Sequence, residues 1–91
     1  MIHELKTKPE YFKAVREGTK LFELRRNDRD FCVGDYLALN EWDGVYTGRT
    51  ELVRINYILN PNDIMTCPGG FVILSILKVN DFDRRKETEH D

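Results

Sequence analysis

The residues best suited to chemistry lie close together in the segment 18–25, which reads Gly-Thr-Lys-Leu-Phe-Glu-Leu-Arg. Three of them, Lys20, Glu23 and Arg25, are ionisable and fall within six residues. A carboxylate beside two cations can hold an arginine in a fixed orientation, and the planar guanidinium matches the oxygens of a phosphate. The same residues could instead form a surface ion pair that contributes about 0 to 1 kcal/mol. The spacing alone leaves both interpretations open.

A short helix over about residues 9–17 is predicted immediately before this segment. Thr7 is the expected N-cap, Pro9 suits the first turn because its missing N–H has no partner to lose there, and Glu10 would complete a capping box. Gly18 can supply the left-handed residue that ends the helix. Three residues at helical spacing form the apolar face of this helix: Tyr11, Phe12 and Val15.

Branched and aromatic residues mark five strands, and turn-forming residues separate them. Alternation along the second strand places Phe22 and Leu24 in the core, whereas Glu23 and Arg25 face a groove or solvent. One helix and about five strands predict a small α+β domain, mostly β, folded as a closed or nearly closed barrel. The expected strands are 2–6, 21–25, 36–41, 51–59 and 71–79.

Length and composition predict one domain over residues 1–80, followed by a charged tail over 81–91 that lacks apolar residues after Phe82 and is expected to be disordered. The longest apolar stretch, 71–77, is too short for a membrane span, and the first residues do not resemble a secretion signal, so a cytoplasmic protein is expected. Cys32 and Cys67 lack the paired spacing of a zinc site, and we expect free thiols, no metal and no cofactor.

The net charge of −2 argues against nucleic-acid binding by bulk electrostatics, which requires a strongly basic surface. The charges are unevenly distributed, however. Residues 1–30 hold eight Lys or Arg against six Asp or Glu, whereas residues 31–79 hold three against five. The N-terminal third is therefore the basic end of the chain.

The pattern G-x-K-x-x-E-x-R at 18–25, followed by Gly34-Asp35 and a strand, resembles the signature of ASCH domains, a branch of the PUA-like superfamily of RNA-binding barrels. Further segments, among them His-Glu-Leu-Lys at 3–6 and Glu-Trp at 41–42, resemble a small bacterial and phage subgroup. The resemblance extends over about residues 2–78. It implies that RNA or a nucleotide binds between the barrel and the helix, against Lys20, Glu23 and Arg25.

Some small ASCH proteins resemble amidohydrolases that deacylate a modified cytidine with a nucleophilic lysine, a threonine three residues later and a carboxylate on a later strand. Lys20 matches the lysine, but Glu23 replaces the threonine, and residues 71–79 contain no carboxylate. This departure puts the same chemistry in doubt. An amide hydrolase that uses Lys20 with Glu23 nevertheless stays open, because a lysine whose charge is suppressed can attack a carbonyl.

Two further cations are candidates for the same binding site. Lys6 ends the first strand just before the helix, and Arg29 lies in the loop that follows the second strand. His3 has no partner at ligand spacing and is expected to be a hydrogen-bonded interior or groove histidine. Three hypotheses result: an RNA-binding or nucleotide-binding module, a small amide hydrolase, and a protein-interaction module that uses exposed apolar residues near Trp42, Tyr46 or Ile64-Met65.

Overall fold

The computed structural model describes residues 1–79 and confirms the five strands and the short helix. The predicted tail at 81–91 lies outside the described residues. In chain order the elements are β1 (Ile2–Thr7), α1 (Pro9–Glu17), β2 (Phe22–Arg26), β3 (Tyr36–Trp42), β4 (Tyr46–Leu59), the 3-10 turn η1 (Pro61–Asp63) and β5 (Phe71–Lys78).

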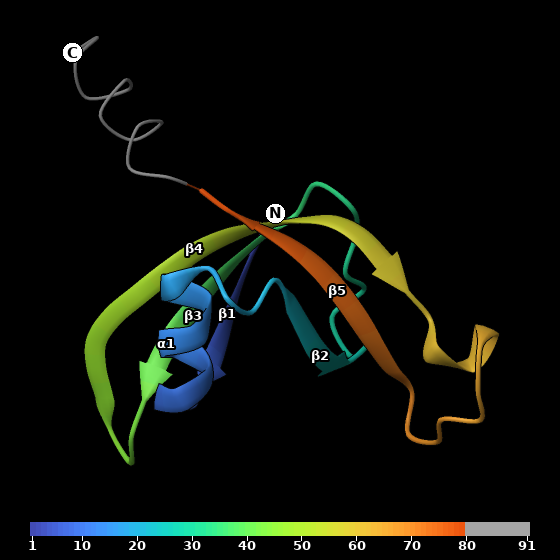
Figure 1. Cartoon of the computed structure of the whole chain (residues 1–91), viewed down its shortest axis with the longest axis horizontal. Helices are drawn as coiled ribbons and strands as arrows, with labels where there is room; N and C mark the ends of the chain where they lie inside the picture. The colour runs from blue at the N-terminus through green and yellow to red at the C-terminus, as the bar shows by residue number, and fades with distance from the viewer. Residues whose placement is uncertain (80–91) are drawn as a thin grey trace, which may run out of the picture.

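The five strands form one curled sheet in the order β1-β3-β4-β5-β2. Strands β1 and β3 are parallel, and every other pair in the described part of the chain is antiparallel. Figure 1 shows the sheet arching over α1 as a half-barrel. The mostly β, α+β fold is thus confirmed, but the barrel is open. Its two edge strands, β1 and β2, are the strands that flank the helix in sequence.

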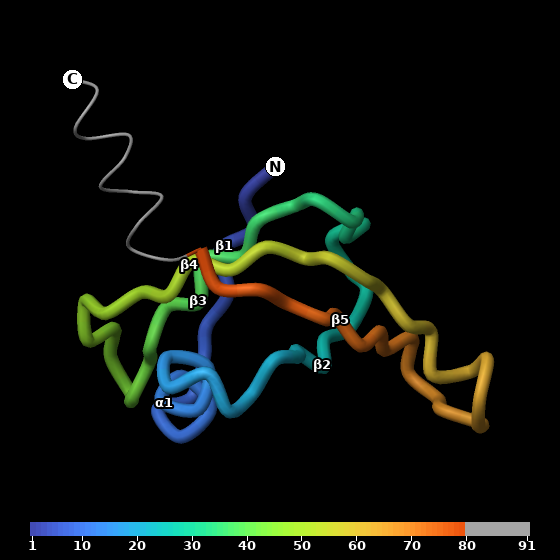
Figure 2. The backbone as a smooth tube through the Cα atoms, turned by 45° about the horizontal axis from the view of Figure 1, so that its top comes forward, coloured from blue at the N-terminus to red at the C-terminus, as the bar shows by residue number. Residues whose placement is uncertain are grey.

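The core lies on the concave side of the sheet. Helix α1 packs there against β3 and β4, at the end of the sheet opposite the β4–β5 turn (Figures 1 and 2). Phe12 and Val15 are buried, as their spacing predicts, whereas Tyr11 is half-exposed. The strands contribute alternate residues to the same core: Leu5, Leu37, Leu39, Val53, Ile55, Val72, Leu74 and Ile76.

The start of the helix differs from the sequence prediction. The N-cap is Lys8, which makes no side-chain capping bond, so the expected capping box of Thr7 and Glu10 is wrong. Thr7 instead ends β1 and is buried, because pairing of β1 with β3 continues to that residue. The end of the helix is as predicted: Gly18 is left-handed, with φ 82° and ψ 10°.

Strand β2 also differs from the prediction in which side chains it buries. Phe22 and Leu24, expected in the core, are 49% and 56% exposed, whereas Glu23 is only 3% exposed. The physical reason is that β2 is an edge strand whose outward face carries no second layer in the described chain. Glu23 and Arg25 face the concave side, where the gap to β1 forms the groove that alternation predicts for them.

His3 is the hydrogen-bonded interior residue that its isolation in the sequence predicts. It is buried, its Nε2 lies 2.8 Å from Asp35 Oδ2, and its ring meets Phe31 edge-on. The hydrogen bond to His3 lowers the pKa of Asp35 below its usual value of 3.8, and a hydrogen bond from the Cys32 backbone N–H acts in the same direction. This pair joins β1 to the turn before β3.

Candidate functional site

A cleft of about 500 Å³ occupies the gap between the two edge strands of the half-barrel. One wall is the end of β1 with the start of α1, and the other wall is the entrance to β2 and that strand as far as Arg25. The sheet therefore leaves its seam open at the place where the predicted site residues meet. The lining consists of Lys6, Thr7, Lys8, Tyr11, Lys20, Phe22, Glu23, Leu24 and Arg25.

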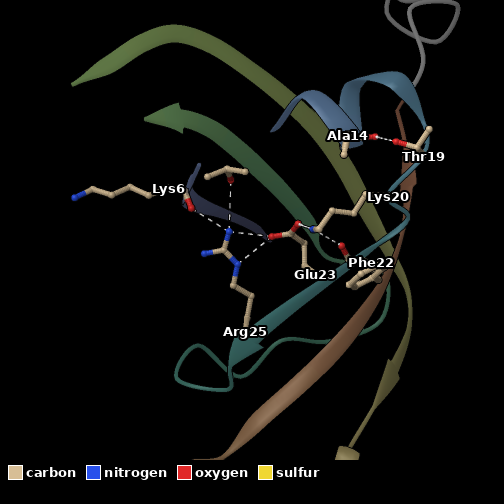
Figure 3. A network of polar contacts seen from close by, with 8 residues as sticks. Lys6, Ala14, Thr19, Lys20, Phe22, Glu23 and Arg25 are labelled. Carbon is tan, nitrogen blue, oxygen red and sulfur yellow. Dashed lines mark hydrogen bonds and ion pairs between the residues drawn. The ribbon is translucent and has the colours of Figure 1, made fainter. Parts of the chain in front are cut away.

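Glu23 is the centre of the polar network in this cleft (Figure 3). One of its carboxylate oxygens accepts hydrogen bonds from Arg25 Nε at 3.0 Å and Arg25 Nη2 at 2.9 Å. The other oxygen accepts a hydrogen bond from Lys20 Nζ. A carboxylate this deeply buried requires paired cations, and here both oxygens are occupied. The buried ion-pair network replaces the exposed surface pair that the spacing alone allowed.

Arg25 connects the two walls of the cleft. Its Nη2 donates to the Lys6 carbonyl oxygen at 3.0 Å and approaches the Thr7 hydroxyl at 3.4 Å, so a β2 side chain reaches across to β1. Within residues 1–79 its Nη1 makes no hydrogen bond and keeps two N–H groups for a ligand. The guanidinium is thus held at one end and free at the other.

Lys20 lies at the entrance to β2 among groups that attract a cation. Its Nζ donates to the Phe22 carbonyl oxygen at 2.7 Å and to Glu23, and among residues 1–79 its third N–H group has no partner. The ammonium also lies 4.9 Å from the centre of the Phe22 ring and 5.6 Å from that of Tyr11. Two half-exposed aromatic rings therefore flank the cation.

The structure brings together four of the five residues predicted for the site. Lys6, Lys20, Glu23 and Arg25 all line the cleft, but the Lys6 ammonium lies 4.7 Å from the Trp42 ring centre, so Lys6 reaches the network through its carbonyl oxygen. Arg29 is not among the lining residues. Its Nη1 donates to the Glu4 carbonyl oxygen at 2.7 Å, which makes it a second bridge between the loop after β2 and strand β1.

Sequence reasoning missed several lining residues. Lys8 carried no signal of its own, Thr7 was assigned to a helix cap, and Tyr11 was placed on the buried helix face. Phe22 and Leu24 were placed in the core. The clue was that Tyr11 and Phe12 are consecutive in the helix. Consecutive helical side chains point in different directions, so when Phe12 faces the core, Tyr11 can face the seam.

Two other buried carboxylates lie outside the cleft, near the β3–β4 turn and the helix. Glu41 accepts hydrogen bonds from the Thr47 hydroxyl at 2.8 Å and from Arg49, and these contacts lower its pKa below the usual 4.5, the Thr47 bond having the larger effect. Glu51 accepts from Arg16 Nε at 2.6 Å and so joins β4 to α1. Each of these carboxylates has a cationic partner and a structural role.

Residues 1–79 contain no group of three or more His, Cys, Asp or Glu arranged to hold a metal ion. Within the same residues, no helix has the length and apolar character needed to cross a membrane. Cys32 and Cys67 are free thiols, as expected.

The fold and the cleft define a class of small, mostly β, half-barrel domain that carries a cation-lined cleft in its open seam. The chain belongs to the family described as a domain of unknown function, DUF3850, whose model matches residues 2–76. It is also similar to an uncharacterised 12.9 kDa protein of the GpA 3′ region of Escherichia phage P2, with 44% identity over 63 residues. That match covers 68% of this chain and 58% of the phage protein, so the chain spans less than two thirds of its relative.

Proposed function

We propose that the cleft between β1 and β2 binds RNA or a nucleotide, with the phosphate against Arg25 and Lys20 and the base beside the aromatic rings. We further infer that the domain is an ASCH domain of the PUA-like superfamily, on the strength of the motif at 18–25 and its position beside the helix. The cytoplasm is the compartment that this proposal implies.

The convergence of charge in the cleft carries the proposal. Three cations, Lys8, Lys20 and Arg25, line it against the single carboxylate of Glu23 among the lining residues, although the whole chain has a net charge of −2. The fourth lining cation, Lys6, has its ammonium over Trp42. The free Nη1 edge of Arg25 and the free N–H of Lys20 are both available to phosphate oxygens. Glu23 holds both side chains, the Lys6 carbonyl also holds Arg25, and the Phe22 carbonyl also holds Lys20, so little of their conformational entropy remains to be lost when an anion binds.

The size and the remaining lining of the cleft support a base as the second part of the ligand. A volume of about 500 Å³ lies within the range of small-molecule sites and accommodates one nucleotide. The rings of Tyr11 and Phe22 are half-exposed and offer faces on which a base can stack. An anion with no aromatic part would contact the cations of the cleft and would leave the rings of Tyr11 and Phe22 without a partner.

A salt-dependent binding titration tests the proposal. Fluorescence anisotropy of a short single-stranded RNA, with uridine 5′-monophosphate as competitor, is measured for the wild type and for Lys20→Ala/Arg25→Ala. We expect the double variant to lose most of the binding and to reduce the slope of log K against log salt by about 1.4, from two lost phosphate contacts at roughly 0.7 each. Lys13→Ala/Lys78→Ala removes equal charge elsewhere and should change the slope little.

A folding control is needed because the double variant leaves Glu23 buried without its partners. Lys20→Ala/Glu23→Gln/Arg25→Ala removes that charge as well and should retain the fold while still losing the binding. RNA affinity of either folded variant equal to that of the wild type would refute the proposed role of the cleft.

A second candidate is the amide hydrolase, which the contact between Lys20 and Glu23 favours because a nucleophile and a base must lie within hydrogen-bond reach. Against it, the carboxylate, the Phe22 carbonyl and the two rings all interact with Lys20 as an ammonium, whereas attack requires the neutral amine. Turnover of acylated nucleosides by the wild type and not by Lys20→Arg would favour the hydrolase. If neither a nucleic acid nor a nucleoside binds, that result would favour the protein-interaction module.

A further inference from the structure

The convex side of β2, β5 and β4 lies opposite the side that packs against α1 (Figure 1), and several of its side chains are exposed although η1 contacts β5. We call this surface the outer face. Strand pairing arranges it in rows: Phe22, Ser75 and Tyr57 form one row, and Leu24, Ile73 and Leu59 form the next. Phe22, Leu24 and Tyr57 are each about half-exposed or more, at 49%, 56% and 61%. The remaining members are Arg26, Arg54, Phe71 and Leu77.

A β-bulge in β4 places Tyr57 on this face. Val53 and Ile55 point into the core, so simple alternation would turn residue 57 inward as well. The register of β4 against β5 shifts between Ile55 and Tyr57, however, and the extra residue is Asn56. As a result Ile58 packs against the core and Tyr57 faces outward. Bulges commonly re-aim a side chain in this way.

The outer face is free of negative charge. Its only ionisable groups, apart from the Tyr57 phenol, are two arginines, Arg26 and Arg54, although acidic residues outnumber basic ones in the chain. Arg26 lies 4.7 Å from the centre of the Phe71 ring and donates to the Gly69 carbonyl at 2.7 Å, so it is held over an aromatic ring. An anionic partner meets no repulsion on this surface.

We propose that the outer face binds the bases of a single-stranded nucleic acid that continues out of the cleft. This inference rests on the proposed function of the cleft and extends its ligand from one nucleotide to a strand. Phe22 connects the two surfaces, because it lines the cleft and also begins the first row of the outer face. A strand with one phosphate at Arg25 therefore leads directly onto Phe22 and then toward Tyr57.

The first row has the geometry of a stacking platform. Phe22 and Tyr57 both pair with Ser75, so two strand spacings, roughly 10 Å, separate the two aromatic residues across the sheet. The small Ser75 leaves space between the rings and offers a hydroxyl to a base edge. Single-strand binders combine such aromatic faces with cations that follow the phosphates, a role that Arg26 and Arg54 can fill here. The absence of carboxylates is an advantage for binding a polyanion, but it gives no particular advantage for binding a protein.

The dependence of affinity on RNA length tests the inference. Binding of uridine 5′-monophosphate and of a uridine hexamer is measured for the wild type, Tyr57→Ala, Tyr57→Phe and Ile73→Glu. We expect Tyr57→Ala to weaken hexamer binding roughly five- to a hundredfold, the range of one lost stacking contact, and to leave the mononucleotide unchanged. Tyr57→Phe keeps the ring and should bind as the wild type does. Val45→Glu, which adds the same charge at an exposed turn, is the control for Ile73→Glu.

The possible outcomes separate the two proposals. If the hexamer binds no more tightly than the mononucleotide, or if the outer-face variants bind it normally, the inference is overturned and the cleft proposal stands. Loss of hexamer binding in Tyr57→Ala but not in Lys20→Ala/Arg25→Ala would reject the cleft proposal and overturn the inference with it, because the strand could not then continue out of the cleft. A wild-type dimer that Ile73→Glu dissociates, with RNA binding unaltered, would make this surface a contact between copies and would also overturn the inference.

Discussion

Replacing Glu23 with glutamine gives the sharpest test of how charge works in the cleft. Glu23 neutralises one unit of charge beside Lys20 and Arg25, and within the described residues both cations keep N–H groups that make no hydrogen bond. Glu23→Gln raises the charge of the lining from +2 to +3 when Lys8, Lys20, Arg25 and the one carboxylate are counted and Lys6, whose ammonium lies over Trp42, is left out. If the cleft binds phosphate, this variant should bind RNA more tightly than the wild type, which is the opposite of a usual active-site substitution.

The size of the effect follows from simple electrostatics. One additional unit charge near a phosphate at a solvated surface contributes about 1 kcal/mol, or roughly a fivefold gain in affinity. The slope of log K against log salt should steepen by about 0.7. Stability should fall by about 1 to 3 kcal/mol, because the ion pairs are lost and because the glutamine amide has only one oxygen to accept from a cation, while its NH2 group can only donate. The loss is moderate since Lys20 and Arg25 remain 16% and 25% exposed and can be hydrated.

Anisotropy titrations between about 50 and 200 mM salt measure the affinity and the slope, and urea unfolding measures the stability. Glu17→Gln removes the same charge from an exposed position outside the cleft and should leave the slope nearly unchanged. A folded Glu23→Gln protein that binds as weakly as Lys20→Ala/Arg25→Ala would refute the reasoning. That result would mean that the orientation of Arg25 matters more than the charge Glu23 cancels.

Two further predictions concern the frame around the cleft. The lowered pKa of Asp35 means that its carboxylate contributes stability fully above pH 3.8, and that this contribution is lost as the pH falls through the lower folded-state value. As the pH is lowered below 3.8, the urea concentration at the unfolding midpoint should therefore decrease more steeply for the wild type than for Asp35→Asn. Parallel curves for the two proteins would contradict the assignment. Gly18→Ala should destabilise the protein by about 1 kcal/mol, because φ is 82° there while no atom lies within 4 Å of the added methyl group. Gly18→Asn should lower the stability less than Gly18→Ala, because Asn tolerates that φ, and thermal melts of the two variants measure the difference.

The elements of the fold could be predicted from the sequence because each depends on local patterns. Pro9, the apolar spacing of Phe12 and Val15, and Gly18 set the bounds of the helix, and the structure confirms them. The strands were found at nearly their observed positions, although β4 begins at Tyr46 and not at residue 51. Thr47 and Arg49 join that strand because they bind Glu41 across the turn, a contact between residues that local propensity does not register.

The direction in which side chains point was harder to predict, since it depends on which strands pair. Alternation separates Glu23 from Phe22 correctly but cannot say which of the two faces the core. Only the position of β2 at the sheet edge, beside an open seam, makes the carboxylate the buried member. In the same way, the outward position of Tyr57 depends on the bulge at Asn56, for which the sequence offers only one asparagine within a strand-like run.

The candidate site was located from one short motif on β2. The contribution of the opposite wall, on β1, could not be predicted, because it depends on residues outside that motif. Lys20, Glu23 and Arg25 are close in sequence, so their proximity in space follows from a single strand. The contribution of Lys6 as a backbone acceptor and of Thr7 as a hydroxyl partner requires β1 to lie opposite β2. Nothing within the motif indicates that relation.

The position of both cleft walls at the sheet edges has a consequence for the order of folding. Strand β1 pairs with β3, with Ile2 opposite Tyr36, and β2 pairs with β5, with Phe22 opposite Ser75. During synthesis both walls thus leave the ribosome before the strands that align them. The consecutive hairpins of β3, β4 and β5 close shorter loops and should form first, since local contacts lose less chain entropy. The earliest part of the chain to be made would then be the last to take its place, and the cleft would form only once β5 is complete.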